Sequence, residues 1–262
     1  MTQILLRSDN NAVASLTLNL PQKLNVLSDE MLAALQDQLD MLATDSTIRA
    51  VIIKGAGKAF CAGHDLKQMT AARQNGDGGK AYFNALFARC GALMRSITKL
   101  PQPVIAQVHG IATAAGCQLV ATCDMAVAAT GTRFGVNGVN IGLFCATPMV
   151  ALTRNIHRKH AFEMLTTGEF IDAEKARTLG LVNRVVAPDA LETATNALAE
   201  KVAGQLGVAV KIGKEAFYKQ GEMTLEDAYA YTGEVMAQNM LFRETRGGIS
   251  AFLDKRAPEW DQ

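Results

Sequence analysis

Three segments of the chain combine glycine with small residues in a way that can leave backbone N–H groups free to bind a ligand. They span residues 57–67 (GKAFCAGHDLK), 110–119 (GIATAAGCQL) and 134–148 (FGVNGVNIGLFCATP). In the first two, we expect a strand to run into small residues and then into a helix. Unpaired N–H groups at a helix start can hold a negatively charged oxygen. Each segment taken alone is also explained by an ordinary turn, by close helix packing or by a long loop.

The charge and the hydropathy of the chain exclude several classes of protein. Its 262 residues include 26 Lys and Arg and 25 Asp and Glu, which gives a formal net charge of +1. Domains that hold nucleic acid usually carry a basic excess, so we expect no nucleic-acid partner. No apolar run approaches the roughly 20 residues that cross a bilayer, so we expect no membrane partner.

The cysteines and histidines indicate neither a disulfide framework nor a metal site. The 5 cysteines are odd in number and form no CxxC pair, which favours a reducing compartment. His157 and His160 are three residues apart, but no acidic or Cys neighbour completes a zinc-ligand set. The N-terminus lacks the pattern of a secretory signal. We therefore expect a cytoplasmic protein without a bound metal.

Hydrophobic periodicity predicts alternating strands and helices, followed by helices alone. We expect Ser28 to cap the first helix, because its hydroxyl can accept a backbone N–H there. The predicted boundary separates a core of residues 1–187 from a helical region of residues 188–262. The predicted strands are 13–20, 50–53, 103–108 and 124–129, and the predicted helices are 29–43, 81–100, 112–121, 173–179, 191–206, 208–220, 225–240 and 245–256.

Taken together, the three segments resemble the enoyl-CoA hydratase/isomerase family, which is also called the crotonase superfamily. The matching stretches are KAFCAGHDLK at 58–67, VHGIATAAGCQLVATCD at 108–124, FGVNGVNIGL at 134–143, LNLPQKLNVL at 18–27, ARTLGLVNRVV at 176–186 and SAFLDKR at 250–256. They cover nearly the whole chain in the family's order. Within the family, AAGCQLVA, VNIGLFCATP and KEAFYKQ are most similar to the group named enoyl-CoA hydratase domain-containing protein 3.

The resemblance implies a fold, a ligand and an assembly. The fold is α/β, a crotonase-like (ClpP/crotonase) spiral of β-β-α units with a helical C-terminal region that makes contacts in homotrimers or homohexamers. The ligand is an acyl-CoA thioester, and no separate cofactor is implied because coenzyme A is part of the substrate. The implied CoA-binding residues are Lys23, Leu24, Ala62, Asp65, Leu66 and Lys67, with Phe252 and Lys255 of the tail reaching the nucleotide of a neighbouring subunit.

The resemblance also assigns an oxyanion hole. Two backbone N–H groups, those of His64 and Ala115, would bind the thioester oxygen and stabilise an enolate. Fixed donors of this kind act without reorganisation, and each contributes ~2.7–4 kcal/mol in measured oxyanion holes.

The chain departs from the family at the two glutamates with which family hydratases add water. Gln118 and Gly138 stand in their places. Glutamine does not exchange a proton at useful pH, and glycine has no side chain. A general acid–base group contributes ~10²–10⁴-fold, so we expect inefficient hydration with enolate stabilisation retained. The polar groups that remain near the acyl carbon are the His64 imidazole, Asn137, Asn140 and Cys145.

Three alternatives remain open at this stage. A decarboxylase of the methylmalonyl-CoA type needs an oxyanion hole but no base, and GHD and VNxG resemble that group. Those relatives, however, keep the first glutamate and carry tyrosine where Cys145 falls. The second alternative is a non-catalytic acyl-CoA-binding or assembly subunit, and the third is a structural protein without affinity for CoA. Thioester binding and turnover, measured together, distinguish them.

Overall fold

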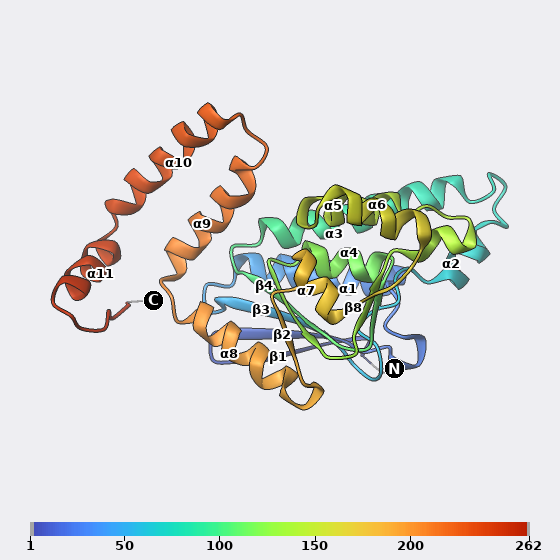
Figure 1. The fold of residues 1–262 in the computed structure, drawn as a ribbon, viewed down its shortest axis with the longest axis horizontal. Helices are drawn as coiled ribbons and strands as arrows, with labels where there is room; N and C mark the ends of the chain where they lie inside the picture. Colours follow the sequence, from blue (N-terminus) through green and yellow to red (C-terminus); the bar gives the residue numbers. More distant parts are fainter. Residues whose placement is uncertain (1–2, 261–262) are drawn as a thin grey trace.

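The computed structural model describes residues 3–260 and has two β-sheets surrounded by helices (Figure 1). The larger sheet has the strand order β1-β2-β3-β4-β6-β9, in which only β1 and β2 pair antiparallel. The smaller sheet has the order β5-β7-β8. The strands are β1 Leu5–Asn10, β2 Val13–Leu18, β3 Ala50–Gly55, β4 Val104–Val108, β5 Ile111–Thr113, β6 Met125–Ala129, β7 Arg133–Gly135, β8 Ile171–Asp172 and β9 Arg184–Val186.

The chain passes from the larger sheet to the smaller one twice, each time through a short turn. Strand β4 is followed directly by β5, and β6 is followed directly by β7. The α-helices are α1 Asp29–Thr44, α2 Leu66–Ala72, α3 Lys80–Lys99, α4 Ala115–Thr122, α5 Ala146–Asn155, α6 Arg158–Thr167, α7 Ala173–Leu179, α8 Leu191–Ala203, α9 Gly207–Gln220, α10 Leu225–Met240 and α11 Arg243–Leu253. The 3-10 helices are η1 Pro21–Lys23, η2 Asn137–Ile141 and η3 Pro188–Ala190.

The parallel strands β3 and β4 at the centre of the larger sheet are buried on both faces, as parallel strands usually are. Successive residues of β3 point to opposite faces, and both sets are buried. Val51 and Ile53 join the main core, whereas Ala50 and Ile52 pack with residues of α8 on the other face. The unbroken apolar run that predicted this strand therefore reflects two apolar environments.

Local sequence explains the first helix well. The Ser28 hydroxyl accepts a hydrogen bond from the Met31 N–H, as expected for an N-cap. Met31, Leu35, Leu39 and Leu42 recur at helical spacing, and all are buried. The helix ends at Thr44, one residue beyond the predicted end.

The structure confirms the α/β fold class and corrects several details. Residues 112–121 were predicted to be one helix, but Ile111–Thr113 form strand β5 and α4 begins at Ala115. Pairing of β5 with β7 decides this, since the run of Ala, Thr and Gly carries no strong periodicity of its own. Among residues 3–260, no helix is long and apolar enough to cross a membrane.

The last three helices leave the body of the molecule (Figure 1). Helix α8 packs on the sheet, whereas α10 has no buried residue along its length. The boundary between residues 187 and 188 stays a prediction, and the attachment of α8 to the sheet is an additional finding. The tail helices α9–α11 therefore present much of their surface outward.

A buried ionic network holds α9 against the body. The Lys214 ammonium donates to Asp124 at 2.6 Å and to the carbonyls of Ile97 and Gln102, both at 2.9 Å. The Tyr218 hydroxyl donates to the other Asp124 oxygen at 2.7 Å. Burial lowers the pKa of Lys214, while Asp124 raises it, so the pair compensates part of its own desolvation.

We predict that Lys214→Met weakens the attachment of the tail. Removing one partner of a buried ion pair costs about 3–5 kcal/mol, because the other charge stays buried without compensation. Denaturant unfolding should show that loss, and limited proteolysis should cut faster between α8 and α9. Lys211→Met, an exposed position on the same helix, is the control. Equal stability and equal cleavage in the two variants would contradict this role of the network.

Candidate active site

Three backbone segments meet beside the smaller sheet and form a continuous hydrogen-bonded frame. The segment after η1 pairs with residues 61–64, which pair in turn with β5. Residues of β5 then bond to the end of β7. The bonds are Ala62 N to Leu24 O (3.0 Å), Leu27 N to Gly63 O (2.7 Å), Cys61 N to Ile111 O (3.1 Å), Thr113 N to Cys61 O (3.0 Å) and Ala114 N to Gly135 O (2.9 Å).

Two residues with left-handed backbone lie against each other in this frame. Gly63 has φ 89° and Ala114 has φ 49°. A Cβ on Gly63 would lie 3.0 Å from the Ala114 Cβ and 3.2 Å from the Ala115 nitrogen. Only glycine fits at residue 63 without displacing its neighbour. The close contact places the peptide groups that follow Gly63 and Ala114 side by side.

Those two peptide groups carry unpaired donors. Within residues 3–260, neither the His64 N–H nor the Ala115 N–H donates to a protein acceptor. Ala115 is the first residue of α4, so its N–H is one of the donors that a helix start leaves without an internal partner. All eight residues of α4 are buried, which fixes the donor in place. Both N–H groups are therefore available to a ligand.

The His64 ring packs against α3. Its Nδ1 lies 3.4 Å from the Leu27 carbonyl oxygen, and the ring meets Phe87 edge-on with centroids 5.8 Å apart. The Nε2 atom is buried and has no partner within residues 3–260. Burial lowers the pKa of His64, although the Leu27 carbonyl and Asp29 partly oppose that effect. The imidazole is therefore neutral at pH 7.

Six of the residues predicted to bind CoA lie in or next to this frame. The Asp65 carboxylate caps α2 by accepting the N–H groups of Lys67 (2.9 Å) and Gln68 (3.4 Å). The Lys23 ammonium lies 3.5 Å from the same carboxylate. Leu66 and the Lys67 side chain are exposed beside them. An anionic ligand approaching here would meet two lysines around one capped helix start.

Gln118 lies one helical turn after Ala115 and is buried. The Cys90 thiol of α3 lies 3.9 Å from its Oε1 atom, at the distance of a weak S–H donor. Burial raises the pKa of Cys90 to about 12, so that thiol stays protonated. The place of the first family glutamate thus holds a neutral amide against a neutral thiol.

Gly138 lies in a turn that closes on itself. A Cβ at this position would lie 2.2 Å from the Leu143 carbonyl oxygen and 2.8 Å from the Cys145 sulfur. Cys145 is buried, and burial raises the pKa of its thiol. The structure therefore brings Cys145 to Gly138, and it leaves no room there for any side chain.

Three predicted residues are not brought to the donors. Asn140 is exposed, and its amide donates to the Gly168 carbonyl at 3.3 Å. Phe252 lies in α11 and is 82% exposed, and Lys255 follows that helix. Figure 1 shows α10 and α11 at the opposite end of the molecule from α2, so these two cannot serve the site of their own chain.

Two further residues, to which the sequence assigned no role, help to build the frame. Asn25 is fully buried and has left-handed backbone, and its amide donates to the carbonyls of Ala56 and Ala59, both at 2.8 Å. Thr113 donates to the Asn137 side-chain oxygen at 2.5 Å and links β5 to η2. The tolerance of asparagine for left-handed backbone was the available signal for Asn25.

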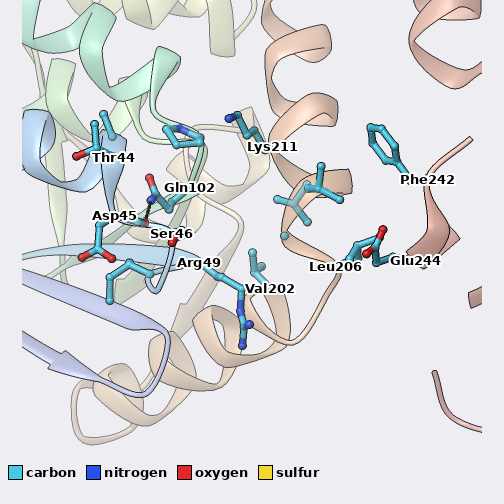
Figure 2. Close-up of a pocket in the computed structure, with 16 residues that line it drawn as sticks. Thr44, Asp45, Ser46, Arg49, Gln102, Val202, Leu206, Lys211, Phe242 and Glu244 are labelled. Atoms are coloured by element: carbon cyan, nitrogen blue, oxygen red, sulfur yellow. Dashed lines mark hydrogen bonds between the residues drawn. The ribbon is translucent and has the colours of Figure 1, made fainter. Parts of the chain in front are cut away.

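The pocket drawn in Figure 2 is a separate feature. A cavity of about 850 Å³ lies between the body and the tail helices, lined among others by Arg49, Gln102, Lys211, Phe242 and Glu244. Figure 2 shows Phe242 and Glu244 across the gap from Gln102 and Arg49. None of the predicted site residues lines it. The residues predicted to form the active site therefore lie outside this cavity.

Comparisons with known proteins agree with the fold. The model of the enoyl-CoA hydratase/isomerase family matches residues 8–262. Enoyl-CoA hydratase domain-containing protein 3, mitochondrial, from Xenopus laevis is 43% identical over 99% of this chain and 86% of that protein. The human protein of the same name is 42% identical over 95% of this chain and 81% of that protein.

Solved structures are similar over the full length. An enoyl-CoA hydratase from Mycobacterium smegmatis has 53% identity and a TM-score of 0.95, with 100% of both chains covered. Human enoyl-CoA hydratase domain-containing protein 3 has 41% identity and a TM-score of 0.94, covering 98% of this chain and 100% of that one. The crotonase-like fold and the likeness to the domain-containing protein 3 group are confirmed.

The expected cytoplasmic location is contradicted, because the Xenopus and human relatives are both named mitochondrial proteins. The described cysteines are free, and free thiols do not distinguish the cytoplasm from an organelle. The match to the family model over nearly the whole chain, together with these relatives, shows that the chain belongs to the enoyl-CoA hydratase/isomerase family.

Proposed function

We propose that this protein binds an acyl-CoA thioester and stabilises its enolate through the backbone N–H groups of His64 and Ala115. The observation that carries the proposal is the pair of unpaired donors fixed by the contact of Gly63 with Ala114. An enolate concentrates negative charge on the former carbonyl oxygen. Donors already in place stabilise that charge more than the neutral thioester, which is the requirement for catalysis.

The CoA part of the ligand would lie along α2 and η1. Lys23 and Lys67 supply positive charge for its phosphates, and the Asp65 carboxylate holds the N-terminal turn of α2. Leu24 and Ala62, joined by a backbone hydrogen bond, form the wall between the lysines and the oxyanion donors. No separate cofactor is part of this proposal.

Water addition by the usual glutamate pair has no support in this site. Gln118 cannot exchange a proton, and the turn at Gly138 is filled by the Leu143 carbonyl and the Cys145 sulfur. A glutamate at residue 138 would require a different course of residues 138–145. The backbone of η2, as well as the sequence, therefore opposes hydration by the usual glutamate pair.

Decarboxylation of a 2-carboxyacyl-CoA is the second candidate, and Asn137 favours it. Its side-chain oxygen accepts from Thr113, which fixes the amide, and its Nδ2 group donates to no protein acceptor within residues 3–260. A fixed amide donor near the enolate site can orient a carboxylate before CO₂ leaves. Incubation with methylmalonyl-CoA tests this candidate, and thioester binding with no product would favour a non-catalytic binder.

The tail would mediate assembly into a homotrimer or homohexamer. Its exposed large apolar side chains are Val208, Phe217, Leu225, Tyr229, Met236, Met240, Leu241, Ile249, Phe252 and Leu253. Large exposed apolar patches usually mark a protein interface.

We predict that light scattering of the intact protein gives the mass of a trimer or a hexamer of the 28.0 kDa chain. Burial of the apolar tail residues between subunits is the physical reason. A monomeric mass across a concentration series would contradict this assignment of the tail.

We predict that Ala115→Pro removes the Ala115 N–H and sets the proline Cδ in its place, next to Gly63 and to the strained backbone of Ala114. Proline is tolerated at the first position of a helix, where the N–H has no helical partner. The probe is acetoacetyl-CoA, a β-keto thioester whose enolate absorbs in the near ultraviolet. Loss of one donor is worth ~10²–10³-fold, so the variant should lose most of the enolate that the wild-type protein stabilises.

Ala115→Ser, which keeps the N–H, is the matched control and should behave as wild type. If Ala115→Pro folds and stabilises as much enolate as the control, the donor assignment is wrong.

We predict that Gly138→Ala destabilises the fold and does not create hydratase activity. The added Cβ would overlap the Leu143 carbonyl, and overpacking of this kind typically costs about 1–3 kcal/mol. Gly213→Ala on α9, where a Cβ meets nothing within 4 Å, is the control and should be neutral or stabilising. Chemical denaturation measures both, and fast crotonyl-CoA hydration by the wild type would contradict the closed-turn account.

A further inference from the structure

The imidazole of His64 has a role that its backbone N–H does not explain. The Leu27 carbonyl oxygen faces Nδ1 at 3.4 Å, and a carbonyl oxygen can only accept. The hydrogen of the neutral ring therefore belongs on Nδ1. This tautomer leaves a lone pair on Nε2, which is buried and has no donor within residues 3–260. A buried acceptor without a partner is costly in a folded protein, so it calls for a donor from elsewhere.

Contacts along α3 link this ring to Gln118. Phe87 packs against the His64 ring, and Cys90 of the same helix contacts the Gln118 amide. Residues three apart lie on one face of a helix, separated by about 4.5 Å along its axis. One face of α3 therefore touches both side chains. Gln118 also lies one turn after Ala115, and His64 carries the other donor on its own backbone, so the ring is close to the oxyanion donors.

Few of the groups at this site can accept a proton. The Gln118 amide does not titrate, and the Cys145 thiol is held protonated by burial. The His64 imidazole is neutral at pH 7, which is the form that can accept a proton.

We propose that His64 is the proton-transfer group of this site and that Nε2 takes a proton from the α-carbon of the bound thioester. The C–H bond breaks, its electron pair moves to the thioester oxygen held by the two N–H groups, and an N–H bond forms on Nε2. Return of the proton to carbon restores the thioester and the neutral ring. This inference rests on the proposed thioester site and adds to it a base that the missing glutamates do not supply.

The charged and titratable groups around the ring define its pH dependence. Asp29 at the start of α1 raises the pKa of His64, and Arg89 of α3 pairs with Asp29. Tyr82 of α3 also contacts Asp29, and its own pKa is raised. The carboxylate of Asp65, the next residue, accepts a hydrogen bond from the Lys67 N–H at the start of α2. Burial outweighs these carboxylates, so the ring should lose its basic form only below its ordinary pKa of 6.5.

Exchange of the α-hydrogens of butyryl-CoA for deuterium, followed by mass spectrometry in D₂O, tests the proposal. The wild-type protein should catalyse exchange at a rate that is flat above neutral pH. The rate should fall tenfold per unit as the pH drops below the pKa of His64. This profile is measured on the unaltered protein and does not depend on whether a variant folds.

His64→Gln and His64→Ala provide the second measurement, because both keep the backbone N–H. Each should bind butyryl-CoA as the wild type does while exchange falls ~10²–10⁴-fold, the contribution of a general base. His109→Gln is the matched control, because the His109 ring lies 2.8 Å from the Gly57 carbonyl, outside the proposed site, and this variant should exchange at the wild-type rate.

The outcomes separate the two proposals. Binding of butyryl-CoA with no exchange, or with exchange that survives His64→Gln, would overturn the role of the imidazole and leave the thioester site intact. A wild-type protein that does not bind butyryl-CoA would overturn the thioester site and the proton-transfer role together.

Discussion

The site depends on the contact between two left-handed backbone positions, Gly63 and Ala114. Ala114 is the costly one, because a non-glycine residue at φ 49° is strained by about 1–3 kcal/mol. Its N–H bonds to Gly135, and the helix that follows is buried along its whole length. The surrounding fold therefore enforces a conformation that Ala114 would not adopt alone. This strained conformation holds the Ala115 N–H beside the His64 N–H.

The sequence predicts those parts of the fold that local chemistry decides. Ser28 and the leucine spacing after it define α1 to within one residue, and the apolar runs locate β3, β4 and β6. Strand β5 was not predicted, because it has only three residues and because Arg133 of β7, the partner of Ile111, lies 22 residues further along the chain. The turn at Gly138 was visible only as a missing side chain, since its closure depends on Leu143 and Cys145 folding back on it.

The same division applies to the candidate site. The family resemblance placed His64, Ala115, Gln118 and Asp65 in one region, and the backbone frame does bring them together. No sequence pattern could show that the His64 ring faces the Leu27 carbonyl, because that contact joins segments far apart in the chain. The tail residues are not brought to the frame. Phe252 and Lys255 lie at the far end of their own subunit, so any role for them at a CoA site needs a neighbouring chain.

The proposed oxyanion hole consists of two fixed N–H groups that polarise the thioester carbonyl. The infrared stretching frequency of that carbonyl, measured by ¹³C-edited difference spectroscopy on bound butyryl-CoA, reports this polarisation directly. Two hydrogen bonds to one oxygen weaken the C=O bond, so the band should move to lower frequency on binding and move partly back in Ala115→Pro. A bound thioester whose carbonyl band stays at its frequency in water would contradict the oxyanion hole.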